Sequence, residues 1–190
     1  MNQFAQLLNR CVYCRVNIAM RTVSSTVISV LLALSFSPAS LALESDSDAP
    51  VTWEAEGNSN MTVEGGIRTL TMEKNVIVSQ GSLRITGDRA IFEYAVESNT
   101  LTRITVYGSP VSYSQKLSED GDTVLGQSET LKLFTEQESD ESIVELIGEA
   151  SIESPDSSMR CAAIVYMVDL DLIREATGPC TGSLSNQSNL

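Results

Sequence analysis

The stretch from Asn75 to Tyr94 constrains the fold more than any other part of this 190-residue chain. Its apolar side chains recur at every second position in three short runs: Val76 and Val78, then Leu83 and Ile85, then Ala90, Phe92 and Tyr94. Glycine stands at both breaks, as Gly81 and as Gly87 followed by Asp88. A period of two with glycine at the interruptions indicates short antiparallel strands and not a helix.

The rest of the chain repeats this unit approximately. Units are expected at Asn75–Gly108, Ser109–Gly148 and Glu149–Gly178, each with a short strand, a turn, a longer strand, a polar turn and a closing strand that ends in glycine. One unit alone leaves an apolar face exposed, and stacked neighbours cover it. No stretch keeps helical spacing over three turns, so the sequence predicts an all-β fold.

Two of the expected strands are apolar on both faces. They are Ser142 to Ile147 and Ala162 to Val168. Either they are sandwiched between neighbours, or one of them is an unpaired edge that invites pairing with another molecule.

The N-terminus predicts a secretory signal peptide over residues 1–42. This segment has arginine but no acidic residue, then an apolar run from Val27 to Phe36 and the small-residue ending Ser40-Leu41-Ala42. Cleavage after Ala42 is expected; an uncleaved membrane anchor is the alternative, and Met20 is an alternative start. The expected order is then a flexible leader (43–50), one β domain (51–180) and a disordered tail (181–190).

Charge excludes one class of partner. All 25 acidic residues follow position 42, whereas three of the twelve basic residues precede it, so the expected mature chain has a net charge of −16. Such a surface repels nucleic acid, and DNA or RNA binding is not expected.

Two cysteines remain after the signal peptide, Cys161 and Cys180. An exported chain meets an oxidising compartment, where such a pair tends to form a disulfide. Their midpoint falls at Leu170-Asp171, the expected tip of the last hairpin. Two buried free thiols are the alternative.

The chain does not have the residues of common catalytic sites. It contains no histidine, which removes Ser-His-Asp triads, Cys-His pairs and histidine-containing zinc sites. Gly65-Gly66 lacks the lysine and Ser/Thr of a phosphate-binding loop. Acidic pairs such as Glu119-Asp120 stand in polar turns, and a hydrolase that uses them is a minor hypothesis. We therefore expect no enzyme activity, catalytic residue, metal or cofactor.

Binding is the remaining class of function, and its candidates are alternating apolar residues that serve either as core or as ligand contacts. They are Val76, Val78, Leu83, Ile85, Ala90, Phe92, Tyr94, Val111, Tyr113, Leu131 and Leu133. Four basic residues lie near these runs and either meet an anionic ligand group at the rim or are solvated: Arg84, Arg89, Arg103 and Lys116.

The run from Asn75 to Ala90 resembles the signature of the OstA-like LptA family of periplasmic lipopolysaccharide-transport proteins. Tyr107 to Gln115 is similar to the family's Gly-x-Pro-Ala-x-(aromatic)-x-Gln element, and Val144 to Ala150 to its Leu-x-Gly-x-Ala element. The resemblance spans roughly Val51 to Gly178. It departs from the family at Lys74 and Gly87, where the usual residues are glycine and alanine.

This resemblance implies a β-jellyroll of stacked antiparallel strands, open at both ends, whose interior holds the acyl chains of lipid A. It also implies head-to-tail stacking of copies into a bridge between inner- and outer-membrane components of the transport system. The expected oligomer edges contain Val51 and Trp53 at one end, and Leu172 and Arg174 at the other. Heterologous strand addition of this kind extends into a filament.

Two other functions remain open. One is the membrane-anchored paralogue of the same transport system, if the N-terminal segment is retained. The other is a self-associating structural β-protein without a lipid ligand.

Overall fold

A computed structural model describes residues 46, 49–117, 121–137, 139 and 141–185 of the chain. These residues belong to one compact unit, Ala39–Leu190. The predicted signal peptide, residues 1–42, lies outside them. No helix within the described part is long and apolar enough to cross a membrane.

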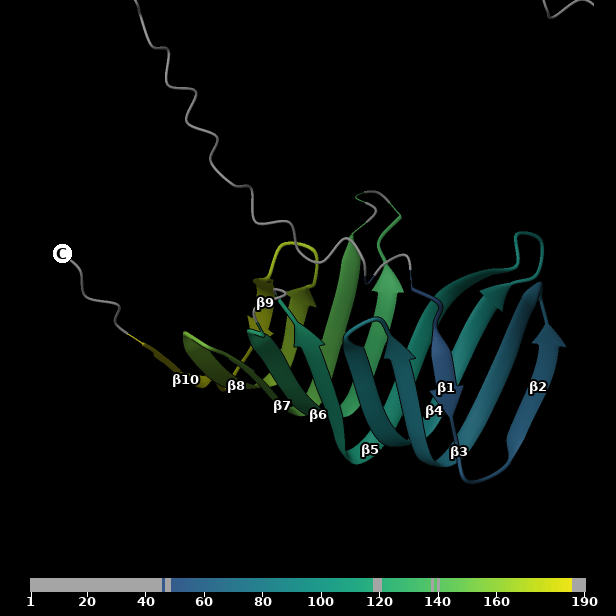
Figure 1. Cartoon of the computed structure of the whole chain (residues 1–190), viewed down its shortest axis with the longest axis horizontal. Coiled ribbons are helices and arrows are strands. Elements are labelled where there is room, and N and C mark those ends of the chain that lie inside the picture. The colour runs from purple at the N-terminus through teal and green to yellow at the C-terminus, as the bar shows by residue number, and fades with distance from the viewer. Residues whose placement is uncertain (1–45, 47–48, 118–120, 138, 140, 186–190) are drawn as a thin grey trace, which may run out of the picture. The chain divides into compact units, whose positions relative to one another are not determined.

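The described residues form a single ten-stranded antiparallel sheet (Figure 1), which confirms the predicted all-β jellyroll class. Its strands are β1 (Thr52–Glu54), β2 (Ser59–Glu64), β3 (Ile67–Gln80), β4 (Leu83–Ala95), β5 (Thr100–Lys116), β6 (Thr123–Thr135), β7 (Ser142–Ser154), β8 (Ser157–Met167), β9 (Leu172–Thr177) and β10 (Thr181–Leu184).

The six long strands, β3 to β8, pair in chain order. At the N-terminal end, β1 and β2 share the outer edge of β3: β1 pairs with Ile77–Ser79, and β2 with Ile67–Met72. At the C-terminal end, β9 and β10 share the outer edge of β8 in the same way. Each end of the sheet therefore presents two short strands.

The core consists of rows of apolar side chains that run across the sheet from strand to strand. One row of cross-strand partners is Leu70, Phe92, Ile104, Leu133, Val144 and Tyr166. The next is Met72, Ala90, Val106, Leu131, Leu146 and Ile164. A third row, in the other half of the strands, is Val78, Ile85, Tyr113, Gly126, Ile152 and Met159. Alternation with a period of two places each row on the inner face.

Each long strand has a corner near its middle, and the corners align across the sheet. The pairing register shifts between Glu73 and Val76, and again at the matching level of every ladder from β4–β5 to β7–β8. Extra residues of this kind bend a strand locally. The sheet folds over along this line, so that its two halves face each other across the core.

Direct packing between the halves is seen at Gly126. A Cβ atom placed there would lie 3.3 Å from Cδ1 of Leu146, which belongs to the opposite half of the sheet. Gly126 in the third row thus leaves room for the large side chain of Leu146 in the second row. Close packing of this kind is what makes a core sensitive to added volume.

The corners correct the predicted strand boundaries. Gly108 and Gly148 were expected to end strands, but they lie inside β5 and β7, at the corners. Gly148 has a φ of 81° and Glu149 a φ of 46°, a left-handed conformation that glycine adopts without steric cost. Glycine there lets a continuous strand turn. Of the three glycines expected to close a repeat unit, only Gly178 follows a strand end.

The two departures from the family signature also lie at corners. Lys74 stands where glycine is usual and adopts a φ of 66°, so a non-glycine residue occupies a conformation that disfavours side chains. Gly87 stands where alanine is usual. A Cβ atom there would come within 2.6 Å of Val106 Cγ1 and 2.7 Å of the Tyr107 carbonyl oxygen, so this corner is closed too tightly for alanine.

Three further predictions have clear outcomes. The strand at Ser142–Ile147 lies in β7, between β6 and β8, so it is sandwiched and not an edge. The disulfide is confirmed, because Cys161 and Cys180 are bonded, and the alternative of free thiols is excluded. The prediction of a disordered tail from residue 181 was wrong at its first residues: Thr181–Leu184 form β10, because β8 offers an edge for pairing. In the expected leader, Asp46 is buried and accepts hydrogen bonds from the Ser82 amide and hydroxyl groups.

The tight corner in β4 predicts the effect of one added methyl group. Gly87→Ala forces the new Cβ atom against the Tyr107 carbonyl, so we expect a loss of roughly 1–3 kcal/mol in the free energy of unfolding, as for overpacked sites. Urea denaturation monitored by circular dichroism measures the loss. Gly178→Ala is the control, because its Cβ atom meets only an ordinary contact at 3.6 Å. Equal stabilities of the two variants would contradict the tight corner.

Candidate functional site

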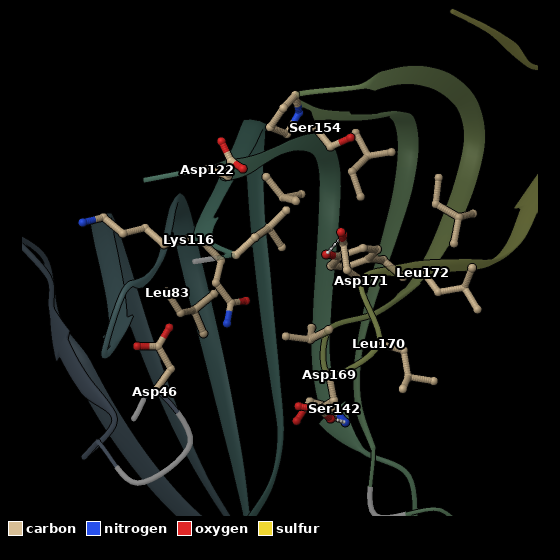
Figure 2. A pocket seen from close by; sticks show the side chains of 18 of the residues that line it. Asp46, Leu83, Lys116, Asp122, Ser142, Ser154, Asp169, Leu170, Asp171 and Leu172 are labelled. Carbon is tan, nitrogen blue, oxygen red and sulfur yellow. Dashed lines mark hydrogen bonds between the residues drawn. The ribbon is translucent and has the colours of Figure 1, made fainter. Parts of the chain in front are cut away.

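A cavity of 1090 Å³ lies between the free ends of the two sheet halves, on the side away from the corners. One wall consists of residues where β4 and β6 begin and where β5 and β7 end. The opposite wall consists of the end of β6, the start of β7 and the hairpin that joins β8 to β9. Figure 2 shows Leu83, Lys116 and Asp122 on one side of this space, and Asp169, Asp171 and Leu172 on the other.

Nine of the 22 residues that line the cavity are leucine, valine or isoleucine and one is the aromatic Tyr166, while half of the lining residues are polar or charged. The apolar residues that line it are Leu83, Leu117, Val124, Leu133, Ile152, Val168, Leu170, Leu172, Ile173 and the ring of Tyr166. They come from both halves of the sheet because the halves diverge away from the corner line. A space of this size with aliphatic side chains on both walls suits a ligand that is bound by burial of hydrocarbon.

Aspartates dominate the polar part of the lining. Asp46, Asp122, Asp156, Asp169 and Asp171 all line the cavity, and Lys116 is the one cation among the described lining residues. Two of the aspartates are held in place: Asp169 accepts a 2.6 Å hydrogen bond from the Ser142 amide, and Asp171 one of 2.7 Å from the Tyr166 hydroxyl. The mouth of the cavity therefore has a negative potential.

Two tyrosines beside the cavity are affected by these carboxylates. Burial raises the pKa of the Tyr113 hydroxyl, and the charges of Asp171, Asp169 and Asp46 raise it further. Burial also raises the pKa of Tyr166, and its hydrogen bond to Asp171 adds to that effect. Both hydroxyl groups have hydrogen-bond partners: Tyr113 donates to Gln115 Oε1 at 2.7 Å, and Tyr166 donates to Asp171. Both are neutral hydrogen-bond donors, because the environment opposes their ionised form. Of the two, Tyr166 lines the cavity.

The structure gathers the eleven apolar residues predicted from sequence into or against one core. Nine of them are buried, while Tyr94 and Leu133 are partly buried and pack against the others. Only Leu83 and Leu133 line the cavity. The rest of the set, such as Phe92 and Val78, lies deeper and fills the space between the sheet halves.

Sequence reasoning missed most of the cavity lining. Leu117, Val124 and Ile152 stand at or near strand ends next to polar loops. Val168 to Ile173 were expected as a strand end, a hairpin tip and an oligomer edge, and not as ligand contacts. One signal was present in the sequence. Apolar residues continue through the hairpin at Val168, Leu170 and Leu172, where a solvated turn would be polar.

The four candidate basic residues separate into two groups. Lys116 lines the cavity. Arg84 is exposed, Arg89 lies over the Tyr107 ring at 5.8 Å, and Arg103 lies over the Phe134 ring at 5.6 Å. Arg103 also lies 3.7 Å from a Glu93 carboxylate oxygen. The three arginines therefore belong to the outer surface of the sheet.

The predicted oligomer edges lie on short strands at the ends of the sheet. Trp53 is on β1, with 42% of its surface exposed, and Val51 precedes that strand. Leu172 and Arg174 are on β9. Arg174 Nη1 donates to Glu136 Oε1 at 2.9 Å, and this interaction lowers the pKa of the Glu136 carboxyl group. Leu172 also lines the cavity, so the C-terminal edge and the cavity are adjacent.

A protein-family comparison relates the folded part of the chain to transport proteins. The family model described as "LptA/(LptD N-terminal domain) LPS transport protein" matches residues 55–171. The lipopolysaccharide export system protein LptA of Escherichia coli K12 is 28% identical over 144 residues, covering 74% of each chain. The export system protein LptH of Pseudomonas aeruginosa is 27% identical over 143 residues, covering 75% of this chain and 76% of the relative.

A solved structure has the same fold. It is the crystal structure of LptH, the LptA-homologous periplasmic component of the lipopolysaccharide transport device of Pseudomonas aeruginosa. The TM-score is 0.61 at 21% sequence identity, and the match covers 74% of this chain and 99% of the other.

The buried tyrosines predict a loss of stability at alkaline pH. A folded-state pKa that is raised above the ordinary value of about 10 leaves stability intact below pH 10 and removes it as pH rises further. Tyr113→Phe removes the buried hydroxyl group. The free energy of unfolding of the variant should therefore fall less steeply between pH 9 and 11 than that of the unsubstituted protein. The difference between the two slopes approaches about 1.4 kcal/mol per pH unit, which is the limit for one proton. Urea titrations measure it, with Tyr107→Phe as a control; identical slopes in all proteins would contradict the prediction.

Proposed function

The chain belongs to the LptA/(LptD N-terminal domain) family of lipopolysaccharide transport proteins, and we propose that it binds lipopolysaccharide and carries or bridges it from the inner to the outer membrane. The proposed site is the cavity between the sheet halves, where the acyl chains of lipid A would lie. The observation that carries this proposal is the two-walled cavity of 1090 Å³, which has aliphatic side chains on both walls.

The binding energy would come from burial of hydrocarbon. Each methylene group transferred from water to an apolar surrounding contributes about 0.8 kcal/mol, so one long acyl chain supplies enough free energy without any charged contact. Leu117, Leu133 and Val168 line the cavity and are only partly buried, so they offer aliphatic surface to a hydrocarbon chain. The sheet can hold a chain in this way because its two halves meet at the corners and diverge at their free ends.

The acidic mouth sets the position of the headgroup. Lipid A is an anionic amphiphile, and five aspartates against one lysine disfavour phosphate close to the cavity lining. The acyl chains would therefore enter while the phosphates remain in solvent, where counter-ions screen them.

Transport over a distance would use the ends of the sheet. We propose that copies stack head to tail through β1 or β2 of one copy and the C-terminal edge of the next, with inner- and outer-membrane components of the system at the two ends of the stack. The support is that β1, β2, β9 and β10 each pair with one strand only within the described chain. Exposed edges of this kind accept further strands. Export to the periplasm by a cleaved signal peptide is part of the same proposal.

A structural, self-associating β-protein without a lipid is the second candidate. The observation in its favour is that nine of the eleven predicted ligand-contact residues are buried in the core, and only Leu83 among these nine lines the cavity. It differs from the transport proposal in the role of the cavity, which would then bind no acyl chain.

Photo-crosslinking at the cavity tests the proposed function. A benzophenone amino acid at Leu133 is expected to capture lipopolysaccharide in cells, because Leu133 lines the cavity. The same group at Arg84, which is exposed and lies outside the cavity lining, is the matched control and should capture none. Adducts are detected by immunoblotting for lipopolysaccharide. Capture from Arg84 with none from Leu133 would contradict the proposal and favour the structural candidate.

The acidic mouth predicts selectivity for headgroup charge. At low salt the protein should bind dodecyl maltoside, which is neutral, more tightly than dodecyl phosphate, which has the same hydrocarbon chain. Asp122→Lys should strengthen dodecyl phosphate binding by roughly threefold, the effect of a partly screened surface charge, and leave dodecyl maltoside binding unchanged. Isothermal titration calorimetry measures both affinities.

Asp88→Lys is the control for this charge reversal, because Asp88 is exposed at the β4 corner and does not line the cavity. An equal gain in dodecyl phosphate affinity from Asp88→Lys would show that overall charge, and not the cavity mouth, sets the selectivity.

A further inference from the structure

Asp46 is the one charged residue that is buried among the residues that the structure describes, with 8% of its surface exposed. It precedes β1 and lines the cavity, where Figure 2 shows it beside Leu83, on the wall that also carries Lys116. Burial of a carboxylate costs free energy unless hydrogen bonds replace the water that it loses. The contacts that Asp46 makes therefore indicate what it does at this position.

Both carboxylate oxygens of Asp46 bind Ser82, which lies 36 residues further along the chain in the turn between β3 and β4. The Ser82 amide donates to Oδ1 at 2.8 Å, and the Ser82 hydroxyl donates to Oδ2. Hydrogen bonds to a charged acceptor are about twice as strong as those between neutral groups. The turn also fits closely around Asp46, since a Cβ atom at Gly81 would lie 2.8 Å from the Asp46 Cα atom.

A second contact attaches the same part of the chain to this turn. Gln80 Nε2 donates to the Ala49 carbonyl oxygen at 3.2 Å, and the Ala49 amide donates to the Asp46 carbonyl oxygen at 3.2 Å. Two residues later, Val51 packs against the core. The chain before β1 was expected to be a flexible leader, but it is attached to the β3–β4 turn at two points.

The Ser82 hydroxyl group connects Asp46 to the end of β5. The backbone ladder between β4 and β5 ends at Arg84 and Ser114. Beyond this pair, the Lys116 amide donates to the Ser82 hydroxyl oxygen at 3.1 Å. Because the hydroxyl proton is directed at Asp46, the lone pairs of the same oxygen are available to the Lys116 amide. Asp46 thus orients the group that continues the contact between β4 and β5 into the cavity wall.

The end of β5 carries side chains that a ligand would meet. Lys116 and Leu117 both line the cavity, and Leu117 is only partly buried. Since the backbone ladder with β4 has already ended, the bond from Lys116 to Ser82 holds this end of the wall on the β4 side. Loss of that bond would let Leu117 move relative to the rest of the wall.

We propose that Asp46 is a positioning residue of the ligand site: through Ser82 it holds the end of β5, so that Leu117 lies where it contacts a bound hydrocarbon chain. The inference rests on the binding of acyl chains in the cavity, which is proposed above. It adds that the chain before β1 is part of the ligand site, and that a group without direct ligand contact controls the shape of the wall.

The test measures binding of dodecyl maltoside by isothermal titration calorimetry, with protein that is expressed as the full chain and purified after export. This probe has a neutral headgroup, so removal of the Asp46 charge has little direct effect on it. Asp46→Ala and Ser82→Ala should each weaken binding by roughly fivefold, the effect of losing one hydrogen bond that positions a contact. Ser82→Thr keeps the hydroxyl group and should restore the affinity.

Two matched controls and one double variant accompany these measurements. Asp88→Ala removes an exposed carboxylate and Ser114→Ala a serine hydroxyl group, and neither residue lines the cavity. Both should bind dodecyl maltoside as the unsubstituted protein does. The double variant Asp46→Ala/Ser82→Ala should lose no more affinity than either single variant, because the two residues act as one unit.

Amide hydrogen exchange, measured by nuclear magnetic resonance, separates local positioning from a general loss of stability. In Asp46→Ala, exchange should quicken by roughly tenfold at the Ser82 and Lys116 amides, since one loses its acceptor and the other loses an oriented one. Exchange at Ile104 and Val106, in the buried part of β5, should stay unchanged. Faster exchange at all four amides would show that Asp46 only stabilises the fold, and would overturn the inference.

The outcomes distinguish this inference from the function on which it rests. If the unsubstituted protein binds dodecyl maltoside and Asp46→Ala and Ser82→Ala bind it equally well, the positioning role is overturned and binding in the cavity stands. Losses that multiply in the double variant would also overturn it, because the two residues would then act separately. Absence of binding by the unsubstituted protein would overturn both the cavity as a hydrocarbon site and the role of Asp46.

Discussion

The line of corners across β3 to β8 is the constraint on which the rest of the structure depends. An antiparallel sheet with one apolar face has to cover that face, and here the sheet covers it with its own other half. Gly148 at a positive φ and Gly87 packed against the Tyr107 carbonyl allow this without breaking a strand. The halves pack closely near the corners and separate at their free ends, so the core and the cavity have the same origin.

The position of the cavity is compatible with the lipid binding that we propose for this acidic protein. The apolar lining comes from strand ends and from the β8–β9 hairpin, while the aspartates occupy the same rim. In the proposed function, burial against the apolar side chains would supply affinity, and repulsion from the aspartates would keep an anionic headgroup in solvent.

Much of the fold could be predicted from the sequence, because alternation with a period of two is local information. Val76, Val78, Leu83 and Ile85 were placed correctly on one face. The Cys161–Cys180 disulfide was expected from export and from the spacing about the last hairpin, with free thiols as the alternative, and the structure confirms the bond. The corners could not be derived in the same way. Glycine that bends a strand and glycine that ends one look alike in sequence, and only the pairing register separates them, as at Gly108 and Gly148.

The cavity was harder to predict than the core. Phe92 and Leu83 have the same alternating context, yet Phe92 is buried between the halves and Leu83 lines the open end. The difference depends on distance from the corner line, a tertiary property. Strand β10 was missed for a related reason: Thr-Gly-Ser-Leu has no strong strand signal, and the edge of β8 together with a disulfide holds it in extended form.

The most direct measurement of the central claim is paramagnetic broadening of methyl signals by a spin-labelled fatty acid bound to the protein. The account predicts selective broadening of Leu133, Val124, Ile152 and Val168, which line the cavity from both halves of the sheet. It predicts sharp signals for Leu184 and Val63, which are exposed at the two sheet ends. Broadening confined to Leu184 and Val63, with the cavity methyl groups unaffected, would contradict it.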